Sequence, residues 1–178
     1  HRWRVTWDGE THDGYWALAA GLSRGVAEGE PLHDPAWLAT IDDAAVARLL
    51  RPTSADTPQI PRMADRVANL RELGRGLLAI GGGDEAALRL VQRAEGSAVR
   101  LVQEIVARFP SFADEATLAG ATVRFYKRAQ ILVADLAGAF DGSGPGAFVD
   151  LDQLTAFADY KVPQVLRRFG LLIYTPGL

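Results

Sequence analysis

Three cations lie close together in the sequence around position 127. Lys127 and Arg128 lie in the segment FYKRAQI at 125–131, and Arg124 directly precedes it. The residues after this segment are mostly apolar. A helix would place Lys127 within about one turn of the apolar residues 123 and 131. A cation among apolar side chains needs an anion, which is either a carboxylate of the protein or a phosphate of a ligand. The alternative is a solvated helix face whose long side chains extend their charges into water.

Asp159 is a carboxylate among aromatic residues. It stands between Phe157 and Tyr160, in the predicted connection between two short helices. Partial desolvation there would move the pKa of Asp159 upward. Such a carboxylate could accept hydrogen bonds from a heterocyclic base, or stabilise the oxocarbenium-like charge that develops when a glycosidic bond breaks. The alternative is an ordinary cap for the helix that begins near Pro163.

Asp135 and the tryptophans could also serve a site, although packing explains both. Asp135 lies within an apolar helical pattern, and we interpret it as a buried structural partner of Lys127 or of a nearby arginine. The tryptophans crowd the first quarter of the chain, at positions 3, 7, 16 and 37. Core packing is the default interpretation for them, and a stacking wall for a flat ligand is the alternative.

The composition excludes several kinds of site. The chain has 178 residues, of which 19 are basic and 22 acidic, so no stable nucleic-acid complex is expected from its net charge of −3. Without cysteine it has no disulfide framework, thiolate metal site or cysteine nucleophile. The three histidines lie in the first fifth of the chain at spacings unsuited to a metal, so we expect no metal. No apolar run approaches the ~20 residues of a membrane span, and we expect a cytoplasmic monomer.

Apolar spacing predicts an all-α domain with a short N-terminal β segment. Alternation over residues 3–7 predicts a strand before a turn at Asp8 and Gly9. Helical spacing then predicts a series of helices, over residues 13–28, 34–37, 43–50, 61–80, 84–109 and 122–140. Asp13 and Asp34 are the predicted caps of the first two. The last of these is apolar on nearly every side, and we expect it to be central and buried. Short helices over 150–157 and 163–169 would form a helix-hairpin-helix-like unit around Asp159.

The length and composition are those of one globular domain. With 48% hydrophobic and 23% charged residues, the chain can bury a sizeable core. We therefore interpret residues 1–178 as a single helical domain. Its last residues follow directly on an apolar segment, which suggests a fragment of a longer native chain.

Four strings of residues form a specific pattern. They are GYWAL at 14–18, FADE at 112–115, FYKRAQILVAD at 125–135 and FADYKVPQVL at 157–166. In this order they resemble the queuosine salvage family, the queuosine 5′-phosphate N-glycosylase/hydrolases. The resemblance extends from the Trp3 region to Tyr174. It implies an all-helical fold related to helix-hairpin-helix DNA glycosylases, and hydrolysis of queuosine 5′-monophosphate to queuine and ribose 5-phosphate without a metal or organic cofactor. Queuine is then available for tRNA modification.

The resemblance also implies roles for five residues. Asp159 would belong to the base-binding cleft, where it recognises queuine, assists cleavage, or both. Phe157 and Tyr160 would flank the deazaguanine ring. Lys127 and Arg128 would face the 5′-phosphate, each charge-assisted hydrogen bond contributing about 1.5 to 3 kcal/mol. Family members extend further in both directions, so the main catalytic carboxylate is either Asp159 or a residue outside this chain.

Two other functions stay open. An enzyme of the same fold could act on damaged bases in DNA, although such proteins present a wider basic surface than this composition offers. A helical module could instead hold a modified nucleoside or a partner protein without catalysis. Asp159 and Lys127 would be needed for binding and for turnover alike, so only product release separates these functions.

Overall fold

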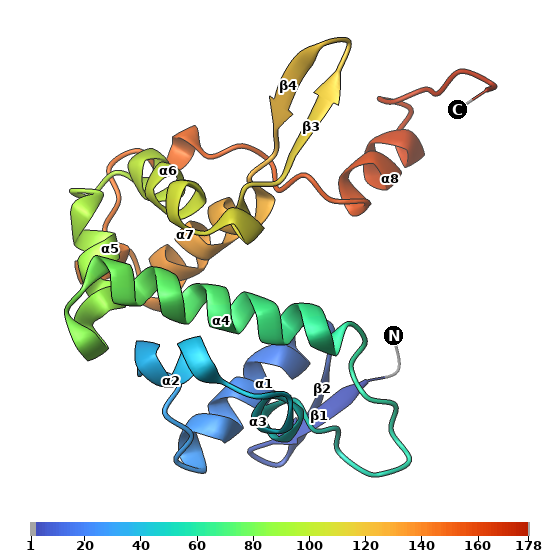
Figure 1. The fold of residues 1–178 in the computed structure, drawn as a ribbon. Coiled ribbons are helices and arrows are strands. Elements are labelled where there is room, and N and C mark those ends of the chain that lie inside the picture. Colours follow the sequence, from blue (N-terminus) through green and yellow to red (C-terminus); the bar gives the residue numbers. More distant parts are fainter. Residues whose placement is uncertain (1–2, 178) are drawn as a thin grey trace. The chain divides into compact units, whose positions relative to one another are not determined.

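The chain folds into two compact units. The computed structural model describes residues 3–177, and the first unit ends at Ala87, where Leu88 begins the second. In the part described, the protein is mostly helical, as predicted, and each unit also contains an antiparallel two-stranded hairpin (Figure 1). A single domain over residues 1–178 stays a prediction.

The first unit begins with the predicted strand. β1 (Arg4–Trp7) pairs with β2 (Glu10–Asp13) around a turn at Asp8 and Gly9, whose φ angles of 50° and 78° are positive. Four helices follow, which are α1 (Gly14–Ala27), α2 (Pro35–Thr40), α3 (Asp43–Leu49) and α4 (Met63–Ile80).

Aspartates cap two of these helices. The side chain of Asp34 accepts a hydrogen bond from the backbone N–H of Ala36, so it caps α2 as predicted. Asp42 does the same for α3 through Ala45. Asp13, which the sequence predicted as the cap of α1, makes no capping hydrogen bond through its side chain.

Trp3 lies in the core of the first unit. It is 2% exposed, and its Nε1 donates to the carbonyl of Leu50 at 3.1 Å. Trp7 and Trp37 pack against the same core and are partly buried. The predicted core packing is wrong for Trp16, which is 68% exposed and meets Tyr15 edge to face.

The second unit contains the helices from α5 onward and a second hairpin. The elements from the unit boundary onward are α5 (Ala86–Arg93), α6 (Ala98–Arg108), β3 (Glu115–Leu118), β4 (Ala121–Arg124), α7 (Lys127–Ala139) and α8 (Lys161–Arg168). The single helix predicted over 84–109 is interrupted, because Glu95 and Gly96 have positive φ angles of 50° and 78°. Ser97 then caps α6 by accepting a hydrogen bond from Arg100. Among the described helices, none is both long and apolar enough to cross a membrane.

Residues 115–124 form a hairpin, whereas the sequence predicted that a long helix begins at residue 122. Ala119 and Gly120 make its turn at positive φ, and Thr122 lies opposite Thr117. β-Branched residues such as Thr122 and Val123 favour a strand. The helix predicted from residue 122 therefore begins only at Lys127. Figure 1 shows this hairpin projecting from α6 and α7.

α7 is buried on one face only. Ala129, Gln130, Val133 and Ala137 are its buried residues, whereas Leu132 is 36% exposed. The prediction that this helix is buried on nearly every side is therefore wrong for its outer face.

The predicted pair of short helices is also wrong in its first half. Only Leu151–Gln153 form a turn of 3-10 helix there, and residues 154–160 have no helix or strand. The second helix is present as α8, which begins two residues before the predicted Pro163 and has no buried residue. The carboxylate of Asp150, where the first helix was expected to begin, accepts hydrogen bonds from Ser97 and from the N–H of Ala98 at the start of α6 and makes no capping bond within its own segment.

Gly74 allows α4 to pack closely on α2. A Cβ at residue 74 would lie 2.2 Å from the backbone nitrogen of Ala39, whereas a Cβ at Gly138 of α7 would meet nothing within 4 Å. We expect Gly74→Ala to lower the free energy of unfolding by about 1–3 kcal/mol or more, the usual effect of overpacking. The matched variant Gly138→Ala should raise it by roughly 0.4–1 kcal/mol. Urea unfolding measures both, and equal stability of Gly74→Ala and wild type would contradict this packing.

Candidate functional site

Lys127 and Asp159, both predicted site residues, meet in the second unit. Lys127 is the first residue of α7, and Asp159 lies two residues before Lys161, the first residue of α8. The Lys127 Nζ lies 3.6 Å from the Asp159 Oδ2, and each side chain is 31% exposed. A carboxylate of the protein, one of the two anions predicted for Lys127, therefore lies beside it. Asp135, the other carboxylate considered for this role, is exposed on α7, so its predicted burial is wrong.

Asp114 fixes the start of α7. Its carbonyl accepts hydrogen bonds from the N–H groups of Phe125 and Tyr126, at 3.0 and 3.4 Å. Its side chain accepts one from the N–H of Lys127 at 3.3 Å. Tyr126 is in the left-handed conformation, with φ 47°, and turns the chain from β4 into the helix. Lys127 is thereby held at the positive end of the helix dipole, where a nearby anion is stabilising.

Asp159 is a helix cap, which is the structural interpretation that the sequence left open, and its functional role stays a prediction. Its Oδ1 accepts hydrogen bonds from the backbone N–H groups of Lys161 and Val162, at 2.8 and 3.3 Å, as a helix cap does. Its Oδ2 faces Lys127. One carboxylate therefore begins α8 and pairs with the start of α7.

The pKa of Asp159 is lowered, so the predicted upward shift is wrong. The hydrogen bond from the Lys161 N–H is the largest cause, and the Val162 N–H and the Lys127 charge act in the same direction. Desolvation raises the pKa, as expected, but these donors outweigh it. Asp159 is consequently a carboxylate at neutral pH and not a proton donor.

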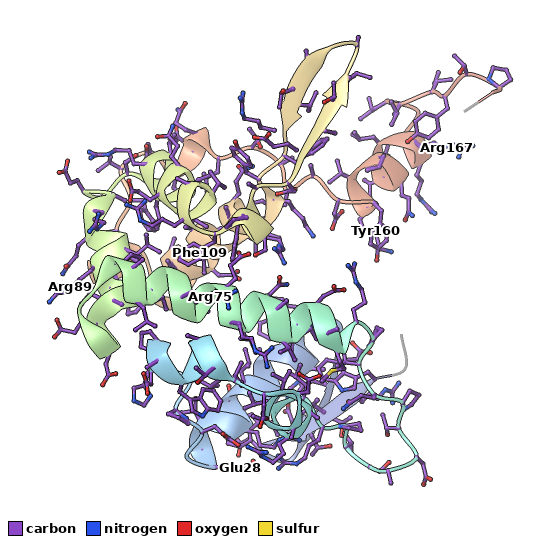
Figure 2. All side chains as sticks on the ribbon, viewed as in Figure 1. Glu28, Arg75, Arg89, Phe109, Tyr160 and Arg167 are labelled. Carbon is purple, nitrogen blue, oxygen red and sulfur yellow. The ribbon has the colours of Figure 1, made fainter. Side chains whose placement is uncertain are left out.

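The two predicted aromatic residues are accessible. Phe157 is 38% exposed and Tyr160 is 69% exposed. In Figure 2 the side chain of Tyr160 extends from the beginning of α8. The Nζ of Lys161 lies 5.4 Å from the centre of its ring, in a cation–π contact. The stacking role of both residues stays a prediction.

The side chain of Arg128 contacts residues other than Lys127 and Asp159. Its guanidinium lies 5.0 Å from the centre of the Phe112 ring and donates a hydrogen bond to the carbonyl of Ser111. These contacts hold the start of α7 on the turn before β3. The phosphate-facing role of Arg128 stays a prediction.

Gln130 lies three residues after Lys127 and was not singled out from the sequence. It is 7% exposed, and its side-chain amide bonds to Thr155 and to the carbonyl of Phe125. Its partner Thr155 lies 25 residues away, so spacing along α7 could not reveal it. The available signal was a polar residue on the apolar face of a helix, three positions after Lys127.

The described residues show no arrangement suited to a metal ion. Within residues 3–177, no group of three or more histidine, aspartate or glutamate side chains could hold one.

Comparison with known proteins gives consistent matches over nearly the whole chain. The family model described as Queuosine salvage protein matches residues 1–178. A protein of Sphaerobacter thermophilus named Queuosine 5′-phosphate N-glycosylase/hydrolase is 50% identical over 177 residues, which are 99% of this chain and 53% of that protein. Proteins of the same name from Mus musculus and Schizosaccharomyces pombe are 40% and 34% identical over 98% of this chain and 50% of theirs. The chain thus spans about half the length of these curated relatives.

We expect the pKa of Asp159 to lie below the ordinary aspartate value of about 3.9. Its contribution to stability is then present above the unfolded-state pKa and is lost as the pH falls through the folded-state pKa. Lys127→Met should raise the pKa of Asp159, because it removes a positive charge. Carboxyl ¹³C NMR titration measures both values, with Arg100→Met of α6 as the control. A wild-type pKa above about 3.9 would contradict the cap geometry.

Proposed function

The chain belongs to the queuosine salvage protein family, and we propose that it takes part in hydrolysing the N-glycosidic bond of queuosine 5′-monophosphate to release queuine. The names of its curated relatives support this substrate and reaction. The observation that carries the proposal is the accessible pair of Lys127 and Asp159. It offers a fixed negative charge for the positive charge that develops on the ribose in the transition state, and a cation 3.6 Å away for the anionic phosphate.

Asp159 stabilises the transition state in this proposal. As the bond between the sugar carbon and the base nitrogen breaks, its electrons leave with the base and positive charge develops on the ribose. An ionised carboxylate stabilises that charge. Water then adds to the sugar carbon and loses a proton, and the departing base gains one. Another group must protonate the base, because the lowered pKa of Asp159 leaves it without a proton to donate.

Lys127 binds the 5′-phosphate in this proposal. Its position at the N-terminus of α7 supports the role, since the helix dipole favours an anion there. Arg128 could add a second contact, but its guanidinium would first have to leave Ser111 and Phe112. Phe157 and Tyr160 would flank the deazaguanine ring, which their exposure permits.

The remaining features of the proposal rest on the sequence. They are a fold relation to helix-hairpin-helix DNA glycosylases, a cytoplasmic monomer, no metal or organic cofactor, and no stable nucleic-acid complex. The net charge of −3 supports the last of these.

Asp159→Asn tests catalysis. Asparagine keeps an oxygen that can cap α8 but loses the charge, so we expect release of queuine to fall by about 10²-fold or more while the fold persists. Mass spectrometry of the free base measures it, with queuosine and guanosine monophosphate as alternative substrates. Asp152→Asn, which changes an exposed aspartate of the same segment, is the control. Near-wild-type turnover of Asp159→Asn would overturn the catalytic role, and nucleotide binding without any release in wild type would favour the binding module.

Lys127→Met tests phosphate recognition. Loss of one charge-assisted contact of about 1.5–3 kcal/mol should weaken binding of queuosine 5′-monophosphate by roughly 10- to 150-fold. Binding of free queuine should be nearly unchanged, because queuine has no phosphate. Calorimetric titration of both ligands measures the difference, with Arg100→Met as the charge control. Equal losses for the two ligands would show that Lys127 has a structural role.

A further inference from the structure

Gln130 makes an unusually complete set of hydrogen bonds for a single side chain. Its Oε1 accepts from the backbone N–H of Thr155 at 2.7 Å and lies 3.2 Å from the hydroxyl of the same residue. Its Nε2 donates to the carbonyl of Phe125 at 2.9 Å and lies 3.0 Å from the Thr155 hydroxyl. At 7% exposure it has little access to water, so these partners are the ones that satisfy its amide.

These bonds join the two segments that carry the ion pair. Phe125 lies two residues before Lys127, and Thr155 lies four residues before Asp159. The segment 154–160 has no helix or strand, and hence no backbone ladder to hold it. Asp150 anchors the chain upstream, at the start of α6. Gln130 provides an anchor on α7 itself, much nearer to Asp159.

We propose that Gln130 is a positioning residue, which sets the separation of Lys127 and Asp159 by tying segment 154–160 to the start of α7. Its effect on turnover rests on the proposed function, whereas its effect on the ordering of the segment does not. An amide is the group that suits this place, because it donates to the Phe125 carbonyl and accepts from the Thr155 N–H. Glutamate would keep only the acceptor, and methionine would keep neither.

Gln130→Met in the full chain is the first test, with Gln103→Met as the matched control. Gln103 is an exposed glutamine on α6 of the same unit. We expect Gln130→Met to speed hydrogen exchange of the Thr155 amide at least tenfold and to leave the amides of α6 unchanged. Release of queuine should fall at least tenfold. Equal protection of the Thr155 amide in wild type and variant would overturn the proposal.

A double-mutant cycle separates positioning from general damage to the fold. If Gln130 sets the place of Lys127 relative to Asp159, Lys127→Met should raise the pKa of Asp159 in wild type and leave it nearly unchanged in Gln130→Met. The same shift in both backgrounds would mean that Gln130 is merely structural.

Thr155→Val keeps the inference testable if Gln130→Met fails to fold. It removes the hydroxyl and retains the N–H bond to Gln130, so we expect a smaller change of the same kind in exchange and turnover. Wild-type exchange and turnover in Thr155→Val would count against the proposal. A wild-type chain that releases no queuine would refute the proposed function instead, while the exchange rates and the pKa cycle would still decide the role of Gln130.

Discussion

Residues 150–160 carry the candidate carboxylate without a regular element to hold them, apart from one 3-10 turn. Side chains replace the missing backbone ladder at three points. Asp150 bonds to the start of α6, Thr155 is held by Gln130 of α7, and Asp159 begins α8. Each of these anchors joins a side chain to a backbone N–H group. The geometry of the candidate site therefore depends on a few hydrogen bonds, two of which join residues 25 and 52 positions apart in the sequence.

The electrostatics of Asp159 follow from this arrangement. A carboxylate that also caps a helix receives backbone N–H donors, and these stabilise its charged form. The same bonds that order α8 thus keep the pKa low. A group in this state can stabilise positive charge, but it is a weak base and has no proton to give. The hydrogen bonds that Asp159 accepts as a helix cap therefore determine that it can stabilise positive charge but cannot act as a general acid.

The sequence predicted those parts of the structure that depend on local patterns. Asp34 caps α2, and the first hairpin turns at Asp8 and Gly9, because short side chains and glycine favour these conformations nearby. The helix expected from residue 122 was wrong, since the spacing of Val123 suits a strand as well as a helix. The sequence predicted that Lys127 needs an anion and that Asp159 is either a cap or a functional carboxylate. It did not predict that the two side chains contact each other. The hydrogen bonds from two N–H groups lower the pKa of Asp159, where an upward shift was expected. The partner of Gln130 lies 25 residues away. Composition and periodicity predict neither of these contacts, because both depend on how the chain folds.

Charge balance links the observed pair to the proposed reaction. Without a ligand, Lys127 and Asp159 offset one another across 3.6 Å. In the proposed function, a 5′-phosphate that binds Lys127 supplies a new anion there and releases the Oδ2 of Asp159, while its Oδ1 stays on the N–H groups of α8. The freed oxygen then faces the only positive charge that the reaction creates, which is the one on the ribose. Because the Oδ1 of Asp159 keeps its hydrogen bonds throughout, the carboxylate exchanges Lys127 for the ribose without moving. Binding of the phosphate, which is far from the breaking bond, thereby contributes to stabilising the transition state.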